Sequence, residues 1–132
     1  PLLITRALQG KTLPIYGNGR NIRDWVFVID HCRAIVSIIE RGKSQQVYNI
    51  GGDCELSNIE VAEMLCDNLQ IDRSSIVFVR DRVGHDLRYA MNYSKLTAET
   101  GWLPSVSFAA GLKITCEWYK NNRDWWYKAT DN

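Results

Sequence analysis

Blocks of apolar residues, separated by polar and glycine-rich stretches, predict short helices and strands in the first part of the chain. Apolar residues between positions 2 and 8 fit the last turns of a helix that stops at Gly10. Residues 13–16 have the pattern of extended backbone. Residues 24–29 are dense in β-branched and aromatic side chains, so we expect a strand with both faces covered, after which Asp30 caps a helix.

The remainder of the chain continues this alternation. Helical spacing of the apolar residues predicts helices over residues 31–41, 57–70 and 93–100, and from Ser107 onward into the Trp-rich tail. The helix at 57–70 begins with the spacing of a capping box, in which a serine is followed three residues later by a glutamate. Two further strands are expected over residues 47–50 and 76–79. The order of elements indicates an α/β fold, with short strands alternating with helices.

Length and composition narrow the class of protein. With 132 residues, the chain matches one domain or an incomplete piece of a larger protein, and its start at Pro1 leads us to expect that it begins inside a domain. Hydrophobic residues are 45% and charged residues 23%, as in a globular protein with a core. The net charge of +1 offers no field that would attract nucleic acid or an anionic membrane. No apolar run or leader pattern suggests a membrane span or export, so we expect a cytoplasmic protein whose four cysteines are reduced thiols.

Arg23 is the first candidate for ligand chemistry. It follows a Gly-rich turn and stands at the mouth of the expected strand, where a guanidinium can clamp a phosphate with two parallel hydrogen bonds. The alternative, with equal weight, is that Arg23 forms an ion pair with Asp24 or Asp30.

Two other loops carry polar side chains suited to a nucleotide. Asn49 stands at the carboxyl end of an expected strand, next to glycines that allow close backbone approach, although an asparagine there also suits a plain turn. Arg82 and His85 lie around a glycine in a loop, and both side chains can donate to phosphate or ribose oxygens, with Asp81 and Asp86 placed to orient them. A solvated charged loop is the alternative.

The aromatic tail and the missing motifs limit the function further. The tail mixes tryptophans with cations, which would allow nucleic-acid stacking, but packing of the last helix against the body is the favoured interpretation. The sequence has no Gly-rich dinucleotide fingerprint, no tyrosine followed four residues later by a lysine, no nucleophile triad and no metal-ligand cluster. We therefore expect no catalytic residues, no bound metal and no retained cofactor in this chain alone.

A set of ordered motifs carries a family resemblance across essentially all residues. These motifs are LPIYGNG, NIRDW, VYNIGG, DRVGHDLRYA, KLTAETGW and EWYKNN. Together they resemble the C-terminal portion of the dTDP-glucose 4,6-dehydratases, which are extended short-chain dehydrogenases/reductases. The YNIGG and RDW motifs also occur in other nucleotide-sugar epimerases and dehydratases, whereas GHD-x-RYA is more particular to the dTDP-glucose branch.

The resemblance implies a substrate-binding role for residues 1–132 of this chain. A complete enzyme of this family keeps NAD on an upstream Rossmann domain, oxidises the hexose, eliminates water and returns the hydride, and it is expected to be a homodimer. That upstream Rossmann half would be missing here. Carried over by motif, the following residues would bind the dTDP-sugar: Pro14, Ile15 and Tyr16 beside the thymine, Arg23 at the diphosphate, Asn49 at the nucleotide, and Arg82 with His85 at the phosphate and ribose. The alternatives are a non-catalytic nucleotide-sugar binding module and a fragment of a related UDP-sugar epimerase or dehydratase.

Overall fold

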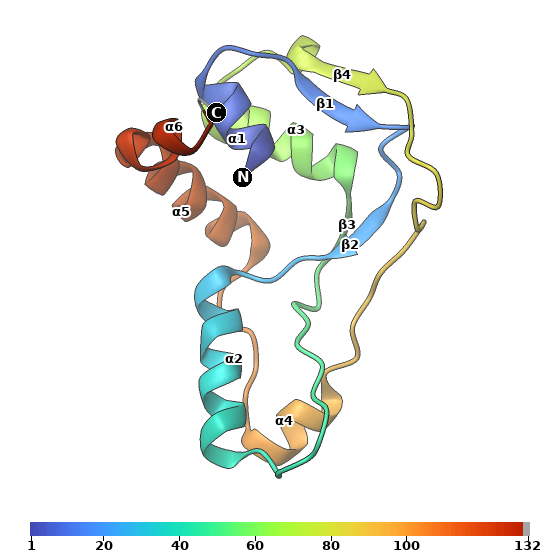
Figure 1. Cartoon of the computed structure of the whole chain (residues 1–132), viewed down its shortest axis with the longest axis vertical. Helices are drawn as coiled ribbons and strands as arrows, with labels where there is room; N and C mark the ends of the chain where they lie inside the picture. Colours follow the sequence, from blue (N-terminus) through green and yellow to red (C-terminus); the bar gives the residue numbers. More distant parts are fainter. Residues whose placement is uncertain (131–132) are drawn as a thin grey trace.

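The chain forms an elongated α/β unit in which two clusters of elements lie at opposite ends (Figure 1). The computed structural model describes residues 1–130. One end holds a pair of strands packed with helices, and the other holds helix α2 (Val28–Arg41) and helix α4 (Ser94–Thr100) (Figure 1). Long, mostly irregular segments connect the two ends and meet at a second, smaller sheet (Figure 1). The expected α/β class is confirmed.

The larger end is built on a pair of parallel strands. Strand β1 (Leu13–Tyr16) pairs with β4 (Ile76–Val79), so that Tyr16 lies opposite Val79 at the carboxyl ends of both. Helices α1 (Leu2–Leu8), α3 (Asn58–Leu69) and α5 (Phe108–Asn121) pack together beside this pair. Their shared core consists of Ile4, Ala7, Leu13, Leu65, Cys66, Leu112 and Cys116. Strands β1 and β4 and helices α1 and α3 were predicted at nearly these bounds, and so was the start of α5.

Local signals at the helix ends agree with the sequence. The Ser57 side chain accepts from the backbone N–H of Glu60, and the Glu60 carboxylate accepts from the backbone N–H of Ser57, which completes the expected capping box. The helix ends at Gln70, which has left-handed backbone. The Ser107 side chain caps α5 by accepting from the backbone N–H of Ala110, and Gly101 ends α4 in the left-handed region that suits glycine.

The smaller end is held together by a buried carboxylate. Helix α2 (Val28–Arg41) packs on α4 (Ser94–Thr100) through a core of Ala34, Leu96 and Trp102. Asp30, which is only 1% exposed, accepts hydrogen bonds from the backbone N–H groups of Ser105 and Val106 and from the Ser105 hydroxyl. Burial on its own would raise the pKa of the Asp30 carboxyl, but these hydrogen bonds outweigh it and the pKa lies below its usual value.

Two predicted strands are wrong. The run 24–29 contains only the end of β2 (Ile22–Asp24), which pairs antiparallel with the unexpected β3 (Glu55–Ser57), and α2 begins at Val28. Asp30 therefore lies inside the first turn of α2 instead of capping it. Residues 47–50 have no regular structure, because no strand within residues 1–130 lies beside them, and Val47 is 82% exposed.

The tail also departs from its prediction. Helix α5 ends before Asn122, and a separate helix α6 (Arg123–Thr130) folds back on it. Trp126 is buried and donates from its indole N–H to the carbonyl of Tyr119, which confirms packing against the body for this residue. Trp118 and Trp125 contact each other edge to face but remain partly exposed. In residues 1–130, no helix is both long and apolar enough to cross a bilayer.

Candidate functional site

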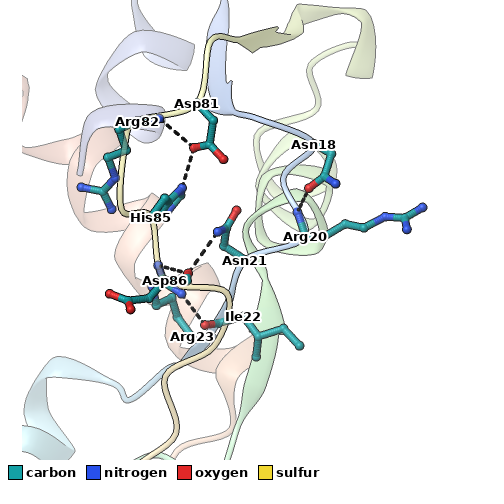
Figure 2. Close-up of polar contacts among 9 residues, drawn as sticks. All are labelled: Asn18, Arg20, Asn21, Ile22, Arg23, Asp81, Arg82, His85 and Asp86. Carbon is teal, nitrogen blue, oxygen red and sulfur yellow. Dashed lines mark hydrogen bonds and ion pairs between the residues drawn. The ribbon is translucent and has the colours of Figure 1, made fainter.

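The loops that follow β1 and β4 meet beside the carboxyl ends of these strands and form the candidate site (Figure 2). Since parallel strands end at the same edge of a sheet, the segment after Tyr16 and the segment after Val79 leave it side by side. Further along, residues 87–89 run next to β2: Ile22 donates from its N–H to the Leu87 carbonyl and accepts from the N–H of Tyr89. This backbone pairing fixes both loops relative to each other.

The structure brings Tyr16, Arg82 and His85 together. The rings of Tyr16 and His85 meet edge to face with centroids 6.4 Å apart, and the Arg82 guanidinium lies 5.9 Å from the Tyr16 ring centroid. His85 Nδ1 lies 2.7 Å from the Oδ1 atom of Asp81, which also accepts from the Arg82 backbone N–H. Figure 2 shows Asp81, Arg82 and His85 along one loop, with the Arg82 side chain turned outward.

Arg23 lies next to this group but is held by different contacts. Its guanidinium donates to the carbonyls of Ile22 and Asp86 and covers the Tyr89 ring at 4.5 Å. Asn21 is 5% exposed and donates to the same Asp86 carbonyl at 3.0 Å. Asp86 thus ties the two loops together through one carbonyl oxygen.

The alternative prediction of an Arg23 ion pair is wrong. Asp24 instead accepts from the backbone N–H groups of Gly52 and Cys54, and Asp30 is engaged by the segment at Ser105. Among residues 1–130, no ion pair joins Arg23 or Arg82 to a carboxylate. The positive charge of these two residues is therefore free to meet an anion.

The remaining residues predicted to bind the nucleotide differ in how accessible they are to a ligand. Tyr16 is 46% exposed and Pro14 is half-buried, but the Ile15 side chain is 3% exposed and belongs to the interior. Asn49 donates weakly to the carbonyl of Asn92 at 3.4 Å. No contact within the described residues joins Asn49 to Arg23, Arg82 or His85.

Three residues that position the site were not identified from the sequence. Asn21 and Tyr89 support Arg23, and Asp24 holds the glycine turn at Gly52. A Cβ on Gly52 would lie 1.8 Å from the Trp25 carbonyl oxygen, so only glycine allows this close approach. The sequence offered one sign of a role for Asn21, which is its position two residues before Arg23. The Asp86 carbonyl that both side chains contact lies more than sixty residues further along the chain.

Electrostatics support an anion site but not a metal site. The hydrogen bond from His85 holds the pKa of the Asp81 carboxyl below its usual value, and the hydrogen bond to Asp86 raises the pKa of Tyr89. Among residues 1–130, no group of three His, Cys, Asp or Glu side chains is arranged to hold a metal ion. The site can therefore offer the guanidinium groups of Arg23 and Arg82 to an anionic ligand.

Comparison with known proteins places this site in a family. The family model described as GDP-mannose 4,6 dehydratase matches residues 1–115, which is most of the chain. The chain belongs to the GDP-mannose 4,6-dehydratase family. Within this family it is similar to the dTDP-glucose 4,6-dehydratases of Actinoplanes sp. (47% identical over 96% of this chain) and of Escherichia coli (43% identical over 99%). It spans about 39% of the length of these curated relatives.

Solved structures of this dehydratase family agree with the fold. The dTDP-glucose 4,6-dehydratase of Bacillus anthracis, in complex with NAD, is 45% identical and superposes over 97% of this chain and 40% of its own length with a TM-score of 0.91. A double mutant of the Streptomyces venezuelae enzyme, also with NAD bound, is 48% identical over 97% of this chain and 40% of its own, with a TM-score of 0.93. A UDP-glucose 4-epimerase of Thermotoga maritima is 30% identical over 92% of this chain and 39% of its own, with a TM-score of 0.86.

Proposed function

We propose that residues 1–132 are the C-terminal, nucleotide-sugar-binding portion of a dTDP-glucose 4,6-dehydratase. The observation that carries this proposal is the identity of 43–48% to such dehydratases along nearly the whole chain, against 30% to the UDP-glucose 4-epimerase. The parent enzyme would convert dTDP-glucose to dTDP-4-keto-6-deoxyglucose and water. Homologues of this chain bind NAD and a dTDP-sugar, and the cofactor would be held by a Rossmann domain upstream of this chain.

The chain's own residues would bind the nucleotide. Arg23 and Arg82, which have no carboxylate partner among the described residues, would hold the diphosphate, and His85 would meet the sugar of the nucleoside. The exposed ring of Tyr16, with Pro14, would flank the thymine. Ile15 would contribute through its backbone, since its side chain is buried, and Asn49 would reach the nucleotide from the opposite loop.

The outer face of α2 supports the proposal of a missing upstream domain. Along this helix, apolar side chains that recur at helical spacing remain 42% to 77% exposed: Val28, Ile29, Ile35, Val36 and Ile39. A contiguous apolar stripe of this kind is typical of a surface that another element covers. Residues 47–50 have a strand-like sequence but no strand beside them, which points to the same missing partner. We propose that the upstream cofactor domain covers both, within a homodimeric parent.

Calorimetry on this chain tests nucleotide binding directly. We expect dTDP to bind more tightly than UDP, and Arg23→Ala to cost about 1.5–3 kcal/mol, or roughly 10- to 150-fold in Kd, because one charge-assisted contact is lost. Arg20→Ala is the matched control, since the Arg20 side chain points away from the cluster in Figure 2. Absence of dTDP binding, or equal effects of both variants, would contradict the proposal. Equal or tighter binding of UDP would favour the epimerase alternative.

An activity assay tests whether this chain is only the substrate-binding portion of the enzyme. With dTDP-glucose and NAD added, we expect no 4-keto-6-deoxy product from this chain, because its sequence has neither a dinucleotide fingerprint nor a tyrosine-lysine pair at catalytic spacing. Product above a blank reaction would contradict this assignment. Supplying the upstream segment of the same gene in trans should restore activity if the parent is an enzyme. A non-catalytic binding module would remain inactive.

A further inference from the structure

Asp81 lies within hydrogen-bond distance of the His85 ring. Its Oδ1 atom lies 2.7 Å from His85 Nδ1 and 2.9 Å from the backbone nitrogen of Arg82. The Asp81 pKa is lowered, foremost by the His85 hydrogen bond, so the carboxylate is ionised at neutral pH and can only accept. The hydrogen of a neutral His85 therefore sits on Nδ1, which leaves a lone pair on Nε2.

The surroundings keep this geometry in place. The His85 side chain is 3% exposed, and the Tyr16 ring stands at 87° to it. The Asp81 carboxylate occupies the space that a side chain at Gly17 would fill, since a Cβ there would lie 2.6 Å from Oδ2. Within the described residues, Nε2 is the ring nitrogen of His85 that has no hydrogen-bond partner. His85 Nε2 is therefore available to contact a ligand.

We propose that Asp81 is a positioning residue that fixes His85 as the Nδ1–H tautomer, so that Nε2 accepts a hydrogen bond from the deoxyribose hydroxyl of the nucleotide. This inference rests on the proposed dTDP binding. A neutral imidazole with its hydrogen on Nδ1 has no donor for phosphate at Nε2, whereas it accepts readily from an O–H group. In dTDP the 3′-hydroxyl is the free hydroxyl of the sugar. The diphosphate is thereby left to the guanidinium groups of Arg23 and Arg82.

Nitrogen-15 NMR of the ligand-free chain at pH 8 tests the tautomer without any substrate. The chain has two histidines, and exposed His31 is an internal reference. We expect the Nδ1–H pattern for His85 in the wild type and in Asp81→Asn, whose amide oxygen still accepts. Asp81→Ala should shift His85 toward the Nε2–H tautomer, while circular dichroism stays unchanged. An Nε2–H signal in the wild type, or no shift in a folded Asp81→Ala variant, would overturn the inference.

A ligand comparison tests the role of Nε2. Removal of one neutral hydrogen bond weakens binding roughly threefold to tenfold. We expect this loss for dTDP in His85→Ala and in Asp81→Ala, with recovery in Asp81→Asn, and no loss for 3′-deoxy-dTDP. Equal losses for the two ligands would show that His85 does not serve the hydroxyl. If the wild type binds neither ligand, the proposed function fails, and the NMR result still decides the tautomer.

Discussion

Replacing Asp30 with alanine should strongly destabilise the smaller end of the chain. The carboxylate is 1% exposed and accepts from Ser105 N at 2.9 Å, Ser105 Oγ at 2.7 Å and Val106 N at 2.8 Å. A hydrogen bond to a charged group contributes about 1.5–3 kcal/mol, but the freed N–H groups lie near the surface and regain part of this from water. We therefore expect a loss of about 3 kcal/mol in the free energy of unfolding.

Urea unfolding of matched variants measures this loss. Asp30→Asn keeps the shape and an acceptor for the backbone N–H groups, so it should cost about 1 kcal/mol. Arg33→Gln is the control: Arg33 lies 3.6 Å from Asp30 and its side chain is 63% exposed, so its loss should cost less than about 0.5 kcal/mol. A loss below about 1 kcal/mol for Asp30→Ala, or equal losses for Asp30→Ala and Arg33→Gln, would refute the reasoning.

The pH dependence gives an independent check on Asp30. Because its pKa is lower in the folded chain than in the unfolded chain, its contribution is fully present above the unfolded value of about 3.9 and is lost as the pH falls through the folded value. The difference in stability between the wild type and Asp30→Asn should therefore shrink as the pH falls below about 4. A difference that stays constant down to strongly acidic pH would contradict an ionised Asp30.

Three further changes have defined outcomes. Ser57→Ala should lower the free energy of unfolding in urea by about 1 kcal/mol, because it removes the cap of α3 and one half of the exchange with Glu60; no loss would argue against the cap. Gly52→Ala should cost about 2 kcal/mol or more, since its Cβ would overlap the Trp25 carbonyl, and thermal unfolding would show this as a lower Tm. We expect the uncovered apolar face of α2 to make this chain self-associate, and Ile39→Lys should reduce that association in sedimentation, because Ile39 is 77% exposed on this face; unchanged association would mean that this face is not the contact.

Many of the candidate site residues could be predicted from the sequence, but the contacts among them could not. Arg23, Arg82 and His85 were recognisable as donors in loops, and the structure places them beside one another. The roles proposed for them remain predictions. An ion pair of Arg23 with Asp24 or Asp30 carried equal weight at the level of sequence, because residues near each other along the chain are the only partners that a local pattern reveals. The partner of Arg23 that joins the two loops, the Asp86 carbonyl, lies 63 residues away along the chain.

The sequence by itself determined the elements that depend on short-range interactions. Two of these elements follow from residues close together in the chain: the capping box at Ser57 and the left-handed glycine at Gly101. The paired strands β1 and β4 follow from apolar runs that form a core in any α/β packing. Residues 24–29 and 47–50 were decided only by tertiary structure. An apolar, β-branched run becomes a strand only when another strand satisfies its backbone hydrogen bonds, and here none lies beside residues 47–50, while residues from Val28 onward satisfy theirs within α2.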